Sequence, residues 1–501
     1  MKKTLCLFLA ALMAASALVS CSSGTENAGT EAEGALPTAG EATPAETEAA
    51  PDENVDVNGY LKDDLPALDF GGQTVSVLFW SDVENAEFDV EEMNGEIVND
   101  AICQRNIDVE DRLKIDFNWV GTPGNNGSKD KYVAVAQASV QAGDGAYDIY
   151  AAYSRTIGAS VVNCLTRTLQ DSPYIDYEKP WWPDNLLEES LIHDRLYFVS
   201  GDISTNVLHM MYCIYYNKQL LEDYNLPIPT DMVFEGTWTV DRLIELTADG
   251  YRDLNGNGRA DINDGFGFTL TDFHNDAFYT GSGLRLVEKD PDTILKISED
   301  FYSEKAVDLL AKIGPWEATD TVYQQGDYET PFTEGRALFN VNRAHYASKA
   351  LRDSELIYGI LPVPKYDENQ QNYRTVMGNP ITLYAVSRDS AIPETDQAVL
   401  ECMASEAYRL TTPAIFENNM KKKYSIDDVN AQMYDIVRAT VSFELGRFFN
   451  QYLSDITDIY FRAVTSNNQN WASTSEKQRK VLNKNISKMV EKIMQNEELG
   501  D

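Results

Sequence analysis

Strand-like and helix-like stretches alternate over residues 72 to 153, and this alternation limits the folds that are open to the chain. Strand-like stretches alternate apolar and polar residues, and helix-like stretches repeat apolar residues at helical spacing. Five such stretches follow one another: GQTVSVLFW (72–80), EIVNDAICQRNIDVEDRL (96–113), KIDFNWV (114–120), KYVAVAQASVQAG (131–143) and YDIYAAY (147–153). The order β-α-β-α-β predicts an α/β fold with a mainly parallel sheet flanked by helices. Ligands of such sheets bind at the carboxyl ends of the strands, which are here residues 79–82 and 153–155.

The first residues of the chain are typical of an export signal. Lys2 and Lys3 precede an apolar run, and LVSC (18–21) resembles the lipobox of bacterial lipoproteins. Residues 1–20 are therefore a predicted lipoprotein signal peptide, and Cys21 is a predicted lipidation site. An ordinary secretory signal that is cut near Cys21 is the alternative. Two acyl chains would hold the protein on the outer face of the cell membrane, with no other membrane contact.

Residues 21–69 begin with the lipidated cysteine and continue as a predicted acidic, disordered tether, because they are rich in Gly, Thr, Ala, Pro and Glu. About 440 residues follow the most biased part of this segment, which is more than one hydrophobic core usually supports, so two lobes are expected. The net charge of −39 excludes nucleic acid as a partner. The thiols of Cys103, Cys164, Cys213 and Cys402 are scattered without a zinc-ligand pattern, and the sequence leaves their disulfide state open.

Three later blocks resemble the recurring blocks of extracellular solute-binding lipoproteins of carbohydrate ABC importers (family 1, maltose-binding-protein-like). They are IYYNKQLLEDYNLPIPTDMVFEGTWTVDRLIELT (214–247), FTEGRALFNVNRAHYASKALRD (332–353) and YGILPVPKYDENQQNYRTVMGNPITLYAVS (358–387). The resemblance implies a two-lobe, periplasmic-binding-protein-like fold of type II, in which each lobe is a mainly parallel sheet flanked by helices.

The resemblance also implies lobe boundaries and a mechanism. Lobe 1 is expected at 70–212 and 358–410, and lobe 2 at 213–357 with the helical part 411–501. A hinge of strands is expected at 195–217 and 358–365. A monomer of this kind captures a sugar or oligosaccharide by lobe closure and delivers it to the transmembrane subunits of an ABC permease.

By position in these blocks, the resemblance implies a set of ligand-binding residues. Sugars are bound by aromatic platforms and by polar groups that form paired hydrogen bonds. The candidates by position are Trp80, Asp82, Tyr153, Arg155, Asp202, Asn342, His345, Tyr346 and Asn379. Two more come from the residues alone: Trp182, in a pair of tryptophans beside prolines, and Trp471. Trp80, Tyr153 and Trp182 could instead be packed inside the lobes. His345 is expected to be a neutral imidazole that forms hydrogen bonds. Trp471 lies in a polar run and is expected to be exposed.

The stretch DLNGNGRADIND (253–264) has the residue spacing of a twelve-residue calcium loop. Its expected ligands are the side chains of Asp253, Asn255, Asn257, Asp261 and Asp264, together with the backbone carbonyl of Arg259. A helix-like stretch precedes the loop, but a strand-like stretch, GFGFTL, follows it, whereas a calcium sensor has a second helix. We therefore expect structural Ca²⁺ that ties a helix to a strand. A calcium-regulated switch and an empty loop are the alternatives.

Two other classes of function compete with solute capture for import. A glycosidase would need a pair of carboxyl groups, which sequence alone cannot reveal, and motifs of hydrolases and phosphate-binding enzymes do not occur. The sequence therefore favours a binding protein that is not an enzyme. A receptor that presents its ligand to a sensor kinase remains an alternative to permease delivery.

Overall fold

The structure is a computed structural model that describes residues 54–83, 86–416 and 428–498. The chain divides into residues 1–52 and residues 53–501, and only the second unit is described below. The predicted signal peptide, Cys21 and nearly all of the most biased part of the tether lie outside the described residues. Within the described part, every helix is too short or too polar to cross a membrane.

The first sheet has the strand order β12-β3-β1-β2. Strand β1 (Gln73–Trp80) pairs in parallel with β2 (Ile115–Thr122) and β3 (Ile149–Tyr153). Strand β12 (Thr382–Val386) returns from a distant part of the sequence and pairs antiparallel to β3. Every residue of β3 and β12 is buried, because helices cover both faces of the sheet. This arrangement confirms the predicted β-α-β-α-β order.

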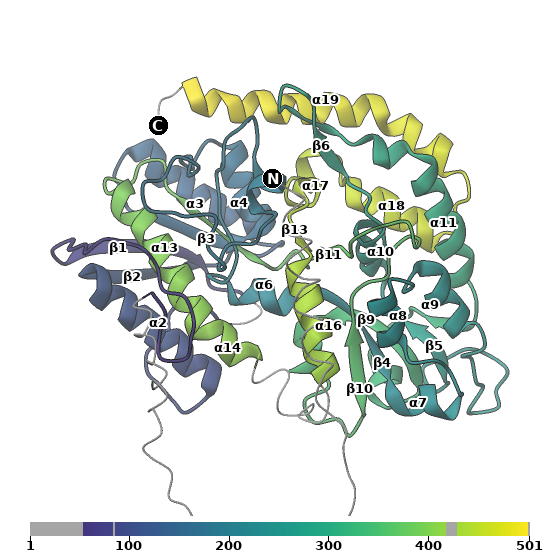
Figure 1. The fold of residues 1–501 in the computed structure, drawn as a ribbon. Coiled ribbons are helices and arrows are strands. Elements are labelled where there is room, and N and C mark those ends of the chain that lie inside the picture. Colours follow the sequence, from purple (N-terminus) through teal and green to yellow (C-terminus); the bar gives the residue numbers. More distant parts are fainter. Residues whose placement is uncertain (1–53, 84–85, 417–427, 499–501) are drawn as a thin grey trace, which may run out of the picture. The chain divides into compact units, whose positions relative to one another are not determined.

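Helices α3 (Lys129–Ala142) and α4 (Ser154–Val162) lie on one face of this sheet, and α2 (Ile97–Leu113), α13 (Pro393–Arg409) and α14 (Thr411–Phe416) lie on the other (Figure 1). Glu96 caps the start of α2 by accepting a hydrogen bond from the backbone N–H of Asn99. Helix α3 ends where Gly143 adopts φ of 61°, the left-handed conformation that glycine adopts without strain.

The second sheet has the order β10-β4-β9-β5-β8 and is mixed in direction. Strand β5 runs parallel to its neighbours β8 and β9, whereas β4 runs antiparallel to both β9 and β10. The expectation of an α/β fold with two sheets is confirmed, although this sheet is not mainly parallel. Its strands are β4 (Tyr212–Asn217), β5 (Phe266–Thr269), β8 (Val322–Tyr323), β9 (Ala337–Arg343) and β10 (Tyr358–Leu361).

Short helices and one hairpin surround the second sheet. The predicted helix before the calcium-type loop and the strand after it are found as α9 and β5. The elements are α7 (Lys218–Asp223), α8 (Pro229–Glu235), α9 (Val240–Thr247), η1 (Asp272–His274), α10 (Asn275–Gly281), β6 (Val287–Lys289), β7 (Leu295–Ile297), η2 (Glu299–Tyr302), α11 (Glu304–Glu317), α12 (Thr330–Thr333) and η3 (Ala344–Ala347).

The connections between the two sheets differ from the expected strand hinge. The first connection contains the short helices α5 (Leu186–Ser190) and α6 (Thr205–Met210) before it reaches β4. The return was expected to begin at 358–365, in lobe 1, but 358–361 form β10, which pairs with β4 in the second sheet. The reason is that β10 is completely buried and completes an edge of that sheet. The chain therefore returns later, through β11 (Thr375–Val376), which pairs with β13 (Val441–Ser442).

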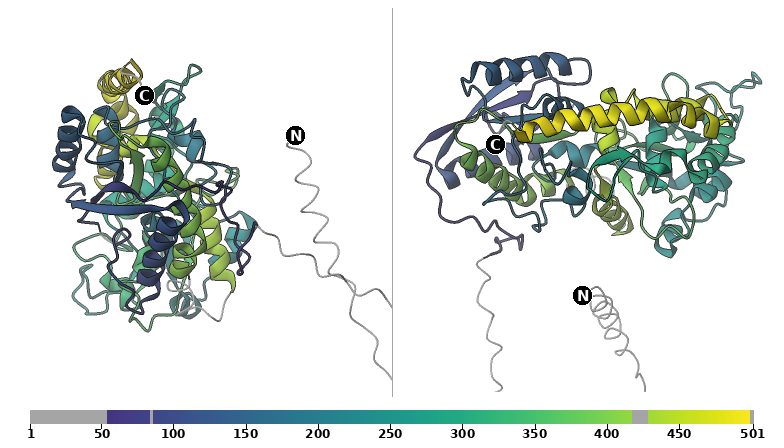
Figure 2. Two further views of the ribbon diagram at one scale, coloured as in Figure 1. Left: turned by 90° about the vertical axis from the view of Figure 1, so that its left-hand side faces the viewer. Right: turned by 90° about the horizontal axis from the view of Figure 1, so that it is seen from above.

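The segment 411–501 was expected to belong to lobe 2 alone, but its helices contact elements that flank the first sheet as well as elements that flank the second. Helix α14 packs against α2 and α13, and α19 contacts α4 as well as α11 and β7. Figures 1 and 2 both show α19 passing over the two halves of the described chain. The remaining C-terminal elements are α16 (Asp428–Ala439), α17 (Leu445–Phe448), η5 (Asn450–Tyr452), α18 (Ile456–Thr465) and α19 (Trp471–Glu498).

The four cysteines of the described residues are free thiols. Cys103, Cys213 and Cys402 are buried, and Cys164 is half-buried. Burial raises the pKa of the Cys213 thiol to about 12, so this side chain behaves as a small apolar group in the core.

Candidate functional site

The carboxyl end of β3 brings the first pair of predicted ligand residues to the boundary between the two sheets. Tyr153 is the last residue of β3, and Arg155 lies in the first turn of α4. Tyr153 is buried and packs against Trp80 with a ring separation of 5.8 Å, whereas Arg155 is half-buried. The Nε of Arg155 donates a hydrogen bond of 3.2 Å to the backbone carbonyl of Arg447. The strand end therefore connects directly to helix α17.

The guanidinium of Arg447 joins segments from both halves of the structure. It donates a hydrogen bond of 3.1 Å to Oδ1 of Asn379, which precedes β12 of the first sheet. It also lies 3.3 Å from a carboxylate oxygen of Asp276, which is in the first turn of α10 beside the second sheet. The side chain of Arg447 is only 3% exposed, and its Nη1 has no partner among the described residues. A buried donor without a partner is unfavourable unless a ligand or water completes it.

The second sheet contributes an exposed aromatic ring next to Asp276. Strand β5 ends at Thr269, and η1 then presents Phe273, which is 40% exposed. Phe273 is held by an edge contact with the buried ring of His274, at 4.7 Å between ring centres. Burial lowers the pKa of His274 well below its usual value, and the cationic Arg343 lowers it further, so the ring is neutral. The exposed face of Phe273 is suited to packing against an apolar surface of a ligand.

Arg343, the last residue of β9, passes close to the segment before β12. A Cβ atom at Gly378 would come within 2.7 Å of Cδ of Arg343, so any larger residue would require this arginine to move. The backbone N–H of Gly378 donates to the carbonyl of Met210, and Ser154 Oγ donates 2.8 Å to the carbonyl of Asn379. These bonds fix residues 378–379 between the two sheets. We call Tyr153, Arg155, Phe273, Asp276, Arg343, Asn379 and Arg447 the strand-end cluster.

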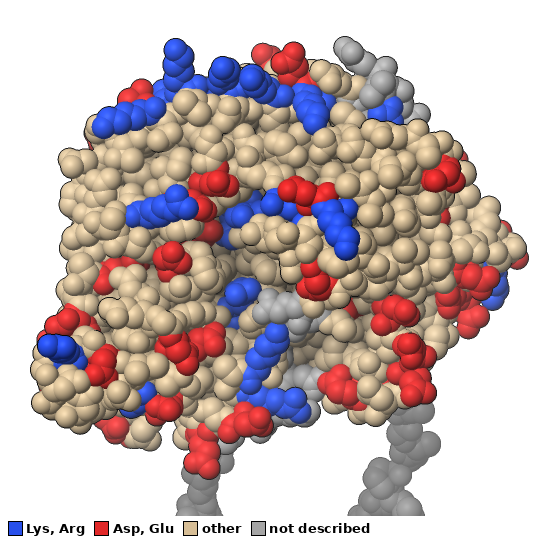
Figure 3. Space-filling model, turned by 180° about the vertical axis from the view of Figure 1, so that it is seen from behind, with Lys and Arg blue, Asp and Glu red and all other residues tan. Residues whose placement is uncertain are grey.

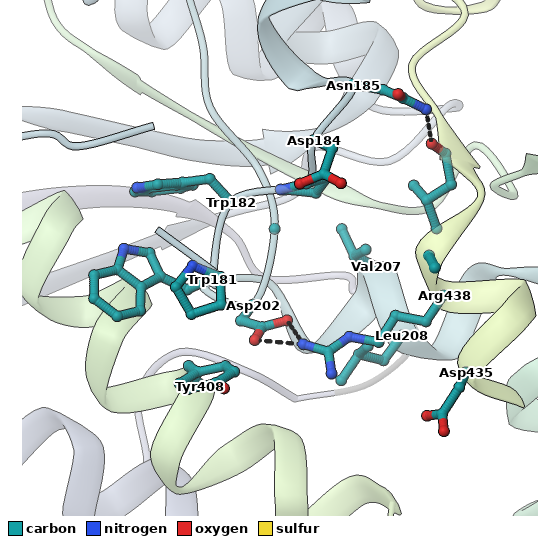
Figure 4. Close-up of a pocket in the computed structure, with 15 residues that line it drawn as sticks. Trp181, Trp182, Asp184, Asn185, Asp202, Val207, Leu208, Tyr408, Asp435 and Arg438 are labelled. Carbon is teal, nitrogen blue, oxygen red and sulfur yellow. Dashed lines mark hydrogen bonds and ion pairs between the residues drawn. The ribbon is translucent and has the colours of Figure 1, made fainter. Parts of the chain in front are cut away.

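A separate cavity of about 330 Å³ lies between the first connection, α13 and α16 (Figure 4). At its wall, Nη2 of Arg438 donates to both carboxylate oxygens of Asp202, at 2.7 and 2.6 Å. Burial raises the pKa of Asp202, and Arg438 opposes this effect. Tyr408 and the backbone around Trp181 complete much of the lining. The carboxylate and guanidinium of this cavity therefore largely satisfy each other.

Comparison with known proteins places these sites in context. A family model, bacterial extracellular solute-binding protein, matches residues 109–409, which is more than half of the chain. The chain belongs to this family. Proteins of this family bind solutes for transporters, so this solute-binding protein is not an enzyme. No curated protein is a significant match.

Solved structures share the fold at low sequence identity. The GacH receptor of Streptomyces glaucescens is 14% identical, with a TM-score of 0.54 over 83% of this chain and 99% of that chain. The sugar-binding protein MalE of Xanthomonas citri is 12% identical, with a TM-score of 0.56 over 83% and 98%. The substrate-binding protein Lmo0181 of Listeria monocytogenes, solved with cycloalternan, is 11% identical, with a TM-score of 0.53 over 83% and 99%. These likenesses show the two-sheet fold.

Only some of the predicted ligand residues meet in the solute-binding protein. Tyr153, Arg155 and Asn379 belong to the strand-end cluster. Trp182 and Asp202 line the cavity of Figure 4, but Trp182 is only 2% exposed. Its indole N–H and that of Trp181 both donate to the buried carboxylate of Glu401, at 2.9 and 3.1 Å. The two tryptophans therefore pack within the first lobe.

Three other predicted ligand residues form internal contacts in this structure: Trp80, Asp82 and Trp471. Trp80 is 1% exposed and donates 3.0 Å to Thr382, in agreement with the alternative that it packs inside the lobe. The carboxylate of Asp82 accepts the backbone N–H groups of 124 and 125 at 2.7 and 3.0 Å. Trp471 was expected to be exposed but is fully buried, because it packs against Phe301 and donates 3.1 Å to the Phe301 carbonyl.

Asn342, His345 and Tyr346 are buried at the end of β9 and in η3. Asn342 donates 2.8 Å to the carboxylate of Glu329, and the Tyr346 hydroxyl lies 3.3 Å from the Glu329 carbonyl. Burial lowers the pKa of His345 to about 2, with a smaller contribution from Arg343, so its ring is neutral. These side chains support the loop before β9 and are not exposed to a ligand in this structure.

The calcium-type loop lies between α9 and β5, where the pairing of Arg252 with Gly265 closes its base. The amides of Asn255 and Asn257 donate to the carboxylate of Asp261, at 3.1 and 2.5 Å, whereas the carboxylate of Asp253 accepts the backbone N–H groups of 256, 257 and 258. Carboxylate and amide side chains are the types that bind a hard cation, and in this structure the amide oxygens of Asn255 and Asn257 accept the backbone N–H groups of 257 and 259. Asp264 is fully buried, and its oxygens accept the backbone N–H groups of 254 and 261.

Sequence reasoning missed Phe273, Asp276, Arg343, Arg447 and Arg438. Phe273 and Asp276 could have been found, because they follow a strand-like stretch, GFGFTL, in the same way that Tyr153 and Arg155 follow β3. Arg447 lies in the mostly apolar stretch FELGRFF, whose only charged residues are Glu444 and Arg447, and charged residues in such a stretch indicate buried partners. Nothing in the local sequence of Arg438 distinguishes it from the surface arginines of other helices.

Glu317 lies beneath the segment that carries Phe273 and Asp276, and it should make stability depend on pH. Burial raises the pKa of the Glu317 carboxyl to about 8. The side-chain amide of Asn275 donates a hydrogen bond of 3.4 Å to one carboxyl oxygen, and the other oxygen has no partner among the described residues. The pKa of Glu317 is higher in the folded protein than in the unfolded chain. Its protonated carboxyl therefore contributes fully to stability below the pKa of the unfolded chain, and this contribution is lost as pH rises through about 8. The free energy of unfolding, measured by urea titration, should fall less between about pH 5 and about pH 8 in Glu317→Gln than in the unchanged protein.

Glu235→Gln is the matched control, because Glu235 is exposed at the end of α8. It should reproduce the pH dependence of the unchanged protein. Equal slopes for Glu317→Gln and the unchanged protein would show that Glu317 does not titrate in this range.

Proposed function

We propose that this solute-binding protein captures a sugar or oligosaccharide at the strand-end cluster by lobe closure and delivers it to the transmembrane subunits of an ABC permease. The observation that carries the proposal is the position of Phe273 and Arg447. One is an exposed aromatic ring on the second lobe, and the other is a buried guanidinium with a free donor between the lobes. Together they offer the apolar surface and the hydrogen-bond donor that a sugar requires.

Structural neighbours support a carbohydrate ligand. Lmo0181 is described in complex with cycloalternan, and the GacH receptor with acarbose. Both are similar in fold to the solute-binding protein over most of its length. A ligand that contacts Phe273 from one lobe and Arg155 from the other gains its full set of contacts only when the lobes close. Closure then reports the presence of the ligand to a permease that contacts both lobes.

Replacement of the exposed ring tests the position of the site. Phe273→Ala should weaken sugar binding by about 1 to 2 kcal/mol, which is roughly a 5- to 30-fold higher Kd, because the stacking surface is lost. Isothermal titration with a sugar found in a thermal-shift screen measures the effect.

Phe234→Ala is the control for this substitution. Phe234 is 52% exposed on α8 and is not part of the strand-end cluster, so its loss should leave Kd unchanged. If Phe273→Ala remains folded and binds with an unchanged Kd, the ligand does not use this ring.

We also propose that Cys21 is lipidated and anchors the protein to the outer face of the cell membrane, because LVSC is followed by a long acidic segment. Cys21→Ala should shift the protein from the membrane fraction to the soluble fraction, as measured by immunoblotting after cell fractionation. Cys164→Ala removes a thiol elsewhere and should leave the protein in the membrane fraction. Unchanged fractionation of Cys21→Ala would contradict lipid anchoring at this residue.

We further propose that the loop 253–264 holds structural Ca²⁺. Asp253, Asn255, Asn257, Asp261 and the carbonyl of Arg259 would bind the cation, which would neutralise the carboxylates and tie α9 to β5. Chelation should therefore lower Tm while sugar binding in the cold persists, as measured by differential scanning calorimetry and titration. In Asp253→Asn, the response of Tm to the chelator should largely disappear. An unchanged Tm of the original protein after chelation would show that the loop holds no stabilising ion.

A further inference from the structure

Glu87 is a carboxyl group inside the first lobe, which is an unusual place for an acidic side chain of this protein. Asp and Glu side chains are scattered over the surface that Figure 3 shows, whereas Glu87 is completely buried. Helix α2 holds its backbone, because Nη2 of Arg105 donates 2.9 Å to the carbonyl of Glu87 and the amide of Asn106 donates 2.8 Å to the carbonyl of Phe88. Burying a carboxyl group is costly unless hydrogen bonds compensate it. The partners of its two oxygens therefore show which segments depend on it.

One carboxyl oxygen of Glu87 binds the start of β12. It accepts a hydrogen bond from the hydroxyl of Thr382, which also accepts the indole N–H of Trp80 at 3.0 Å. Thr382 is the first residue of β12 and follows Asn379 of the strand-end cluster by three residues. This bond therefore holds the segment of Asn379 from its C-terminal side.

The other carboxyl oxygen binds the start of α6. It accepts the backbone N–H of Asn206 at 2.9 Å, the hydroxyl of Thr205 at 2.8 Å and the hydroxyl of Ser204 at 3.3 Å. Helix α6 ends at Met210, whose carbonyl accepts the backbone N–H of Gly378 at 2.7 Å. This second path therefore reaches the same segment from its N-terminal side.

Both crossings between the lobes lie next to this segment. Met211 follows α6 and pairs antiparallel with Met377, and β4 of the second sheet begins at the next residue, Tyr212. The chain thus enters the second lobe directly after α6 and returns directly before Gly378. The carboxyl group of Glu87 binds one end of each crossing, through the start of α6 and the start of β12.

We propose that Glu87 is a positioning residue for the ligand site, because the two paths that begin at its carboxyl group hold residues 378–379 from both sides. The proposal rests on the function proposed above and adds a residue that sets the geometry of that site. Oδ1 of Asn379 accepts a hydrogen bond from Arg447, so a shift of Asn379 removes a contact that orients this guanidinium and its remaining donor. A site loses affinity when its polar groups are no longer held in the binding geometry. Because Glu87 is buried, it acts through these residues.

The test removes the bonds from each end and follows hydrogen exchange of the Gly378 amide. Glu87→Met keeps a side chain of similar length and removes both oxygens. Its matched control is Glu401→Met, because Glu401 is also buried in the first lobe but accepts two indole N–H groups there. Thr382→Val removes the hydroxyl, and Thr382→Ser keeps it. Exchange is measured by mass spectrometry on the mature protein without ligand, and Kd by isothermal titration with maltotriose, maltotetraose and acarbose.

Glu87→Met and Thr382→Val should each speed exchange in peptides that contain Gly378 by at least about tenfold, whereas peptides of β5 in the second sheet should exchange as before. Kd should rise by about tenfold in the same two variants. Glu401→Met and Thr382→Ser should leave both quantities unchanged.

Unchanged exchange at Gly378 in Thr382→Val, or equal acceleration in Glu87→Met and Glu401→Met, would overturn the positioning role. Faster exchange with an unchanged Kd would also overturn it, because the ligand would then not depend on this segment. If the two methionine variants do not fold, the two variants of Thr382 decide. Absence of binding by the unchanged protein would count against sugar capture, and exchange at Gly378 would still decide whether Glu87 positions the segment.

Discussion

The burial of one guanidinium organises the contact between the two sheets. Arg447 reaches Asn379 from the first sheet and Asp276 from the second, and its carbonyl receives Arg155 from α4. A buried charge is tolerated only when its partners arrive at hydrogen-bond distance. The segments that carry these partners must therefore meet at one point, although they are far apart in the sequence. The position of Phe273 follows, because it precedes Asp276 by three residues in the same turn.

The local pattern of the sequence was enough to predict the first sheet. The β-α-β-α-β order depends on periodicity within short stretches, and β3 ends at Tyr153, as expected. The ligand candidates that follow this strand also reach the cluster. The same reasoning, applied to GFGFTL, would have pointed to Phe273. Local patterns are therefore informative wherever a side chain directly follows a strand.

Features that depend on distant contacts could not be predicted in this way. Residues 358–361 were assigned to the return connection, but their pairing with β4 is decided by which sheet edge is open. Trp471 lies in a polar run and is nevertheless buried, because Phe301 and Tyr460 cover it from other helices. The role of Arg447 likewise depends on partners that lie 68 residues away in one case and in α10 in the other. Such pairings follow from tertiary packing, which periodicity does not encode.

The charge of the chain and that of the cluster act over different distances. Under physiological salt, screening limits the field of exposed carboxylates to about 8 Å, so the net charge of −39 has little effect inside a partly enclosed site. A buried charge such as that of Arg447 is screened less than an exposed one. The surface can therefore remain strongly acidic, which favours solubility, without setting the charge inside the site.

Helix α19 has a mechanical consequence for the movement of the lobes. With 28 residues it is about 42 Å long, and it touches α4 at one part of its length and α11 and β7 at another. A helix resists stretching, so the two halves cannot separate along this side without releasing one of these contacts. If the lobes open and close as proposed, the opening is therefore on the side away from α19. A permease that distinguishes open from closed protein would contact the side where this displacement is largest.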